Sequence, residues 1–153
     1  FTSELRARAF LAGEWIDYGI LARRMVTNNG VAYLVDAWDN RSVNLEDMNY
    51  HGCGTGTAAE AQTDAALGTE CTTVLNPDNT RATGTRSQPT ANQYRSVGTP
   101  AFDGAAAVTE HGLFNQAATG GGVLWDRSVF AAINVAAGDS IQFTYTLTVN
   151  AGG

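Results

Sequence analysis

The ten residues SIQFTYTLTV, Ser140 to Val149, alternate between apolar and polar side chains. Apolar residues recur at every second position from Ile141 to Val149, with hydroxyl and amide side chains between them. Successive side chains of a β-strand point to opposite faces of the sheet. This period of two therefore predicts a strand with one face on a hydrophobic core. It is the clearest secondary-structure signal in the chain, and it indicates a protein built on β-sheet.

The sequence before this strand also reads as short strands separated by turn residues. Asp103-Gly104, Gly120-Gly121-Gly122 and Ala137-Gly138-Asp139 are typical turn sequences. Together with the last strand, they indicate about seven to eight strands with turns roughly every 8–12 residues, which is typical of an all-β sandwich. At 153 residues the chain has the length of one domain. Further predicted strands lie at residues 80–87, 93–102, 105–114 and 123–135.

The N-terminal segment is predicted to stand apart from the sandwich. Residues 2–11 suit a short helix or an extended arm, with Arg6 and Arg8 on the polar side. This divides the chain into an arm or helix at 1–14 and a β-sandwich domain at 15–153. Two interpretations stay open for the segment: an arm that reaches a partner, or a helix that packs on its own sandwich.

Two further local structures are predicted between residues 15 and 70. The apolar runs 15–26 and 31–38 flank an Asn-Gly turn at Asn29-Gly30, which is a strong β-hairpin signal. Residues 58–67 are rich in alanine and predict one or two helical turns. Elsewhere, Trp15, Trp38 and Trp125 are expected to fill the core together with several phenylalanines.

Composition and charge exclude several classes of function. The net charge is −6, and all nine basic residues are arginine. Nucleic-acid binding needs a basic surface, so this balance argues against it. No apolar run approaches the ~20 residues of a membrane-spanning helix. The first ten residues carry Glu4, Arg6 and Arg8, where a secretion signal would be apolar.

A nucleotide site is suggested by Gly54-Thr55-Gly56-Thr57-Ala58-Ala59, which fits the G-x-G-x-x-A fingerprint of dinucleotide-binding proteins. That fingerprint requires a buried parallel strand before the glycines and a helix after them. The preceding residues 44–51 are too polar for a central strand, and the chain has no βαβ alternation. We therefore expect no strand to run into Gly54, and no dinucleotide to bind.

Catalytic and metal-binding patterns are also weak. His51, His111, Cys53 and Cys71 could in principle supply four metal ligands, but the cysteines and histidines lack metal-site spacing. Each histidine adjoins a glycine, which suggests a loop cap or a subunit contact. The cysteines are interpreted as small buried or loop thiols, and a disulfide between them stays open. We predict no enzyme activity, no cofactor and no metal.

Carboxylates provide one structural hypothesis. The pairs Asp36/Asp39 and Asp103/Glu110 could serve glycoside hydrolysis, but solvated turns explain such residues equally well. Glu110 and Arg127 lie within otherwise neutral predicted strands. Because a charge in such a place is usually paired, we predict a Glu110–Arg127 ion pair.

Several stretches resemble segments of small virion structural proteins of tailed bacteriophages. Their order and spacing extend over roughly residues 15–149, most of the chain. Each stretch alone is a weak indication of the family, and their combination in this order is more specific. The stretches are HGCGTGT (51–57) with DAALGTE (64–70), TEHGLF (109–114), residues 120–130 with Arg127 and Phe130, and GDSIQFTY (138–145).

The resemblance implies a capsid cement, or decoration, protein that sits on the lattice of a phage head. It implies a jelly-roll-like β-sandwich that forms trimers at three-fold positions and binds the major capsid protein. Such a protein is made in the host cytoplasm and resides in the virion. The family has no catalytic residues that could be transferred to this chain.

On this resemblance the motif residues are structural. Glycines provide tight turns, Asp64 and Glu70 fix a loop, and Glu110 with Arg127 serves strand pairing or subunit contact. His51 and Cys53 depart from the motif. The candidate capsid or subunit contacts are Arg6, Arg8, His51, Gly54, Gly56, Asp64, Glu70, Glu110 and Arg127.

Some proteins of this kind are assigned to tails, which supplies the alternative function. A tail-associated or receptor-binding module would recognise a surface glycan through aromatic rings placed beside acidic residues. Tyr50 and Tyr94 are the aromatic residues predicted to lie in loops.

Overall fold

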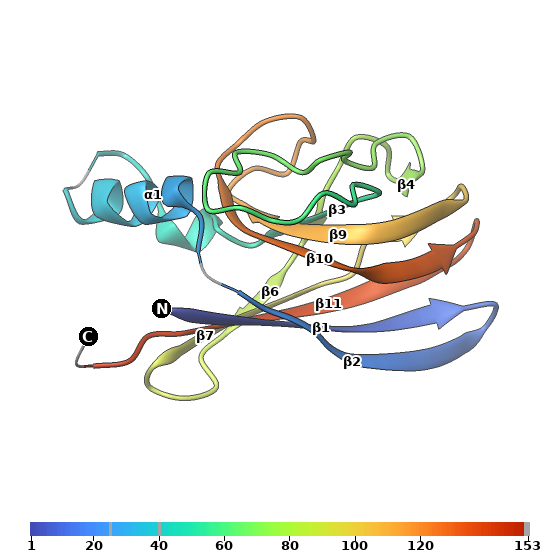
Figure 1. The fold of residues 1–153 in the computed structure, drawn as a ribbon, viewed down its shortest axis with the longest axis horizontal. Coiled ribbons are helices and arrows are strands. Elements are labelled where there is room, and N and C mark those ends of the chain that lie inside the picture. Colours follow the sequence, from blue (N-terminus) through green and yellow to red (C-terminus); the bar gives the residue numbers. More distant parts are fainter. Residues whose placement is uncertain (25, 40, 152–153) are drawn as a thin grey trace.

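The computed structural model describes residues 1–24, 26–39 and 41–151, and it is a sandwich of two antiparallel β-sheets with one short α-helix in that part of the chain. Figure 1 shows the sheets stacked, with the helix at one end. The predicted β-sandwich is confirmed. The strands are β1 (Thr2–Leu11), β2 (Glu14–Arg24), β3 (Tyr50–Gly54), β4 (Leu75–Asn76), β5 (Ala82–Thr83), β6 (Thr85–Ser87), β7 (Gln93–Gly98), β8 (Ala101–Phe102), β9 (Ala106–Phe114), β10 (Leu124–Val135) and β11 (Ser140–Thr148); the helices are α1 (Asn28–Trp38) and the 3-10 helix η1 (Leu45–Asp47).

The large sheet has the order β2-β1-β11-β7-β6, with β8 pairing β11 and β4 pairing β8. The small sheet has the order β10-β9-β3-β5. Strand β11 is central in the large sheet: Phe143 faces Ala7 of β1 on one side and Gly98 of β7 on the other. Its alternate residues from Ile141 to Leu147 are buried, as the period of two predicts.

The core lies between the sheets. Strands β1 and β11 contribute Leu5, Phe143 and Tyr145, and the small sheet contributes Leu113 and Ile133. The Trp125 indole N–H donates to the Tyr145 hydroxyl at 2.9 Å, which satisfies a buried polar group on each strand. Of the three tryptophans, Trp125 alone is in the core. The other two are at least half exposed, so their predicted core positions are wrong.

The N-terminal segment is a strand of the sandwich, and the predicted arm or helix at 1–14 is wrong. Strand β1 lies between β2 and β11 and pairs with both along its length. Leu5, Ala7 and Ala9 are buried, whereas Arg6 and Arg8 between them face outward. This is a period of two, as in a strand that has one face on the core.

The Asn-Gly sequence starts a helix, so the hairpin predicted there is wrong. Thr27 caps α1, and its Oγ1 accepts a hydrogen bond from the Gly30 N–H at 3.0 Å. Gly30 also lies against Trp125, where a Cβ atom would come within 2.8 Å of the Trp125 carbonyl oxygen. The β1–β2 hairpin turns instead at Ala12-Gly13, where both residues have positive φ.

Two smaller differences concern the rest of the chain. Residues 58–67 form a loop with turns and bends, and the predicted helical turns are absent from this described stretch. The described residues form more strands than predicted, and four of these strands, β4, β5, β6 and β8, are only two or three residues long. Over the described residues, α1 and η1 are both too short to cross a lipid bilayer.

We expect Phe143→Ala to lower the free energy of unfolding by about 3–5 kcal/mol, because it leaves a cavity in a core that cannot collapse to fill it. Phe143 is fully buried and packs against the rings of His111 and Phe130. Urea unfolding followed by tryptophan fluorescence measures the change. Thr144→Ala, on the outward face of the same strand, is the matched control and should change stability by less than about 1 kcal/mol. Equal effects of the two variants would contradict the assigned faces of β11.

Candidate functional site

The glycine-rich motif follows strand β3, so the prediction that no strand runs into Gly54 is wrong. Strand β3 pairs antiparallel with β9 and β5, and residues 55–59 continue as a loop. A dinucleotide fold has a parallel strand before the glycines and a helix after them, and neither is found in these described residues. The polar residues that argued against a strand lie mostly before Tyr50, in and around η1.

The glycines make room for a buried carboxylate. A Cβ atom on Gly54 or on Gly56 would come within 2.5 Å of Glu110 Oε1. Glu110 lies on β9, opposite Gly54, and is fully buried. Any side chain at these two positions would displace the carboxylate, so the G-x-G spacing serves an internal contact.

Three backbone N–H groups and one arginine bind the Glu110 carboxylate. Oε1 accepts from Gly56 N–H at 2.9 Å and from Thr69 N–H at 2.8 Å, and Oε2 accepts from Gly68 N–H at 2.9 Å. The guanidinium of Arg127 donates to Oε2 from Nε at 2.9 Å. Burial alone would raise the pKa of Glu110, but these backbone and arginine contacts outweigh it and lower the pKa.

Arg127 carries this contact onward to the loop after β3. Its Nη1 donates to Asp64 Oδ2 at 2.9 Å and its Nη2 to the Ala58 carbonyl at 3.1 Å. Asp64 Oδ2 also accepts from the Ala61 N–H at 2.8 Å. The predicted Glu110–Arg127 ion pair is confirmed, with Nη2 and Oε2 at 2.8 Å, and Asp64 extends it to a triad.

A second ion pair holds the other end of the loop. Arg81 Nε and Glu70 Oε1 are 2.6 Å apart, and the Arg81 side chain is almost fully buried. Arg81 also donates to the carbonyls of Gln116 and Gly121, and its guanidinium lies 3.5 Å from the centre of the Phe114 ring. Sequence reasoning missed Arg81; it pairs with Glu70, whose side chain is 14% exposed.

The two histidines meet inside the core. His51 Nδ1 and His111 Nε2 are 2.9 Å apart, and His51 Nε2 is 2.8 Å from Ser96 Oγ. A serine hydroxyl in contact with one histidine, which in turn contacts a second, resembles the arrangement of a catalytic nucleophile and its general base. All three residues are completely buried, however, so no substrate reaches Ser96. The predicted loop or subunit contacts of these histidines are wrong, because both lie on strands that face the opposite sheet.

Burial changes the protonation of this core group. It lowers the pKa of His51 to about 3. It also lowers the pKa of His111 well below the usual range, with the charge of His51 adding to the effect. Elsewhere in the interior, burial raises the pKa of Asp126 to about 6 against the opposing hydrogen bonds from Ser3 and Ser128. Both histidines are therefore neutral at neutral pH.

The remaining candidates are spread over the molecule. Arg6 and Arg8 face solvent from β1, and Asp36 and Asp39 are at the exposed end of α1. Asp103 lies in the turn before β9 and does not join Glu110. The cysteines are buried free thiols, and no three histidine, cysteine or acidic side chains gather as a metal site in the described residues.

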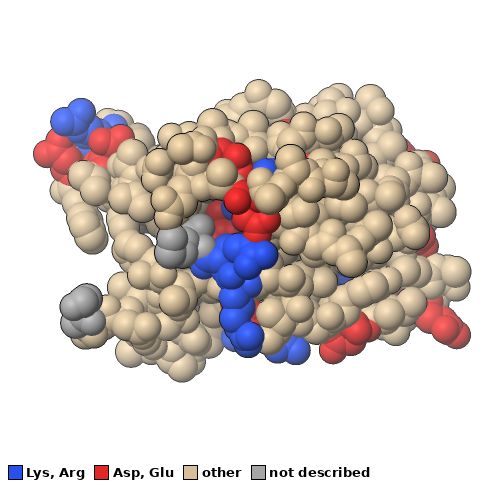
Figure 2. Space-filling model, viewed as in Figure 1, with Lys and Arg blue, Asp and Glu red and all other residues tan. Residues whose placement is uncertain are grey.

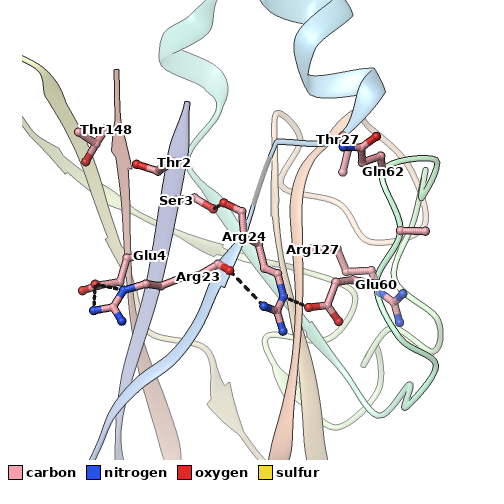
Figure 3. Close-up of a pocket in the computed structure, with 11 residues that line it drawn as sticks. Thr2, Ser3, Glu4, Arg23, Arg24, Thr27, Glu60, Gln62, Arg127 and Thr148 are labelled. Atoms are coloured by element: carbon pink, nitrogen blue, oxygen red, sulfur yellow. Dashed lines mark hydrogen bonds and ion pairs between the residues drawn. The ribbon is translucent and has the colours of Figure 1, made fainter. Parts of the chain in front are cut away.

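The loop also encloses a pocket with the end of the large sheet. Its volume is about 500 Å³, and Figure 3 shows strands β1 and β2 on one side and the loop residues Glu60 and Gln62 on the other. The charges in it are paired: Arg24 with Glu60 across the pocket, and Arg23 with Glu4 on the sheet. We interpret the pocket as a structural contact between the large sheet and the loop.

No protein-family model matches the chain, and no match was found among curated proteins or among solved structures. The function is therefore inferred from the geometry of this chain and from the motifs in its sequence.

We expect Glu110→Gln to lower the free energy of unfolding by about 3–5 kcal/mol, because it leaves Arg127 buried with only part of its charge compensated. In a double-mutant cycle with Arg127→Met, the coupling energy should exceed about 1 kcal/mol. Glu46→Gln is the matched control: Glu46 pairs with Arg86 at 3.3 Å on the surface. Such exposed pairs contribute less than about 1 kcal/mol. Additive effects of the two buried substitutions would contradict the assigned pairing.

We expect the protein to lose stability as the pH falls from about 7 to about 5. The unfolded chain binds protons on histidine near pH 6.5, whereas folded His51 and His111 resist protonation, so acid favours unfolding. Each histidine contributes about 1.4 kcal/mol per pH unit below 6.5. Asp126 partly offsets this loss of stability. Its raised pKa means that the folded state takes up a proton on Asp126 as the pH falls through about 6, which stabilises the folded state.

Urea unfolding at several pH values in this range measures the net slope, which should lie between about 1 and 3 kcal/mol per pH unit. Asp126→Asn removes the opposing carboxyl group and should steepen the slope. A free energy of unfolding that stays constant or rises on acidification would show that the two histidines are not buried in neutral form.

Proposed function

We propose that the chain is a structural virion protein of a tailed bacteriophage: a capsid cement protein that stabilises the head by bridging capsid subunits as a trimer. The motif resemblance supports this proposal. The observation that carries it is that large apolar side chains are exposed on α1 and on β2, near opposite ends of the sandwich. Exposed apolar clusters of this kind are typical of surfaces that bind other proteins.

The first cluster is a stripe on α1. Val31, Val35 and Trp38 are spaced as successive turns on one helix face, and their exposed fractions are 42%, 51% and 75%. The helix buries Gly30 and Tyr33 against the sandwich. A helix that only covered its own core would carry polar residues on its other face. The exposed stripe therefore suits contact with another protein.

The second group of exposed apolar residues lies on both faces of the edge strand β2. Trp15 shares the outer face with Phe10 and Arg8, whereas Ile16 lies on the other face; Trp15, Ile16 and Ile20 are exposed by 50%, 44% and 39%, and Tyr18 by 37%. The Trp15 ring packs 5.4 Å from that of Phe10, and the Arg8 guanidinium lies 4.4 Å from the centre of the Trp15 ring. These contacts fix the orientation of the tryptophan, so less conformational freedom is lost when a partner binds.

The two clusters are far apart. In Figure 1, α1 lies at one end of the sandwich, and the β1–β2 turn, beside Trp15, lies at the other. On the face in Figure 2, charged side chains gather at the helix end and in a strip near the middle, and acidic side chains also lie along the lower right edge. Two separate docking surfaces suit a protein that joins two neighbours, and trimers multiply such modest contacts.

The buried ion pairs fit the same function. Asp64, Glu70, Glu110 and Arg127 belong to the resembling motifs, and all four hold loops within the chain. These residues stabilise the fold. The side chains of Glu110 and His51 are fully buried and are therefore not available for capsid contact. We therefore place the contact surfaces of the proposed cement protein on α1 and β2.

The test uses virions of the phage that encodes the chain. Deleting the gene should lower the temperature at which the heads release DNA, and adding the purified protein should restore it. Trp15→Ser and Trp38→Ser each change an exposed residue, so both variants should fold normally. We expect at least one to rebind heads about tenfold more weakly, since losing a buried tryptophan contact costs more than ~1.4 kcal/mol.

Thr85→Ser, an exposed change on β6, is the control and should behave as the wild type. Sedimentation equilibrium tests the trimer, whose mass should be three times the 16.1 kDa of the chain. Absence of the protein from heads, or undiminished binding by both tryptophan variants, would contradict the proposal.

One observation favours the alternative function, a tail module that recognises a glycan. Trp15 is exposed on the same face of β2 as Asp17, two residues along the strand, and an aromatic ring beside an acidic residue is the combination that sugar binding needs. Tyr50 and Tyr94, predicted to be loop aromatics, lie on β3 and β7 and are partly buried, so they do not serve this role. Cryo-electron microscopy of the virion distinguishes the two functions by location, because the alternative requires the protein to be in the tail.

A further inference from the structure

The two cysteines lie directly opposite each other on adjacent chain segments. Gly54 and Glu70 form an antiparallel bridge, so the residues next to them, Cys53 and Cys71, face one another. The Cys71 N–H donates to the Cys53 carbonyl at 2.9 Å. Side chains of directly opposed residues lie on the same face of a sheet, and their Cα atoms in such a hydrogen-bonded pair are about 5.5 Å apart.

The side chains meet inside the protein. Both are buried in the main core, with exposed fractions of 1% for Cys53 and 6% for Cys71. The two thiols are close enough for each to change the pKa of the other. Disulfides most often join Cα atoms about 5.5–6 Å apart, so directly opposed positions of this kind suit a disulfide.

We propose that Cys53 and Cys71 are a modification site: a dithiol that a small-molecule disulfide such as oxidised glutathione converts to a cross-strand disulfide. This inference is independent of the proposed virion function. The bond would join strand β3 to residue 71 and close the intervening loop, whose interior contacts are those of Glu110 and Arg127. It would fix covalently a loop that the ion pairs already hold.

The reaction balances as two exchanges. The Cys71 thiolate attacks one sulfur of oxidised glutathione, forming a mixed disulfide and releasing one glutathione thiolate. The Cys53 sulfur then attacks Cys71 Sγ and releases the second glutathione, while the Cys53 proton passes to solvent. Two protein thiols are thus oxidised and one glutathione disulfide is reduced to two glutathione molecules.

The order of attack follows from the surroundings of the two thiols. The neighbouring Cys53 thiol lowers the pKa of Cys71, although burial and the charges of Glu110 and Glu70 oppose it. The proximity of Cys71 and burial raise the pKa of Cys53. Cys71 is also the less buried of the two, so it is the sulfur that meets the oxidant first.

The test is a redox titration of the whole chain in glutathione buffers. Digestion after glutamate separates the cysteines, because Glu60 and Glu70 lie between them. Oxidised wild-type protein should yield peptide 47–60 linked to peptide 71–110, and the intact chain should lose the mass of two hydrogen atoms. Its midpoint of thermal unfolding should rise by about 5–10 °C, as expected for closing a loop of this length.

Cys53→Ala and Cys71→Ala are the matched controls. Each should give no linked peptide, and the same melting temperature in reduced and oxidised buffer. The wild-type titration needs neither variant, so it remains decisive if one fails to fold. Three results would overturn the proposal: reduced cysteines across the whole titration, a stable glutathione adduct on Cys71, or disulfides between separate chains.

Discussion

The Glu110 carboxylate is buried, and three backbone N–H groups and the Arg127 guanidinium bind it. An ionised carboxylate inside a protein is strongly unfavourable unless each oxygen has partners, so this arrangement constrains everything around it. Gly54 and Gly56 must lack side chains, the segment 68–69 must present its N–H groups, and Arg127 must lie on the neighbouring strand. The loop after β3 takes its shape from this one group.

That constraint also explains how the two faces of β9 differ. One face sends His111 and Leu113 into the main core between the sheets. The other face carries Glu110 and Phe114, which the loops after β3 and β9 cover. A strand buried on both faces has no solvent-facing residues. The whole TEHGLF stretch is therefore buried, with its polar residues satisfied internally.

The proposed function joins this rigid interior to the exposed ends. The ion pairs of Arg127 and Arg81 hold the loops of the small sheet, and α1 and β2 project their apolar side chains outward. A cement protein needs a scaffold that does not deform while its surfaces bind. In this chain the resembling motifs supply the scaffold, and residues outside them, or at their margins, supply the surfaces.

The sequence by itself determined the β-sandwich, strand β11 and the Glu110–Arg127 ion pair, because period-two alternation and an isolated buried charge depend on local spacing. The tertiary structure decided the rest. Asn29-Gly30 starts a helix because Thr27 caps it and Trp125 packs against Gly30. Residues 2–11 became a strand because β11 was there to pair with them. The glycine motif, Arg81 and the histidine pair acquired their roles from residues distant in sequence, and a single sequence carries no signal for such partners.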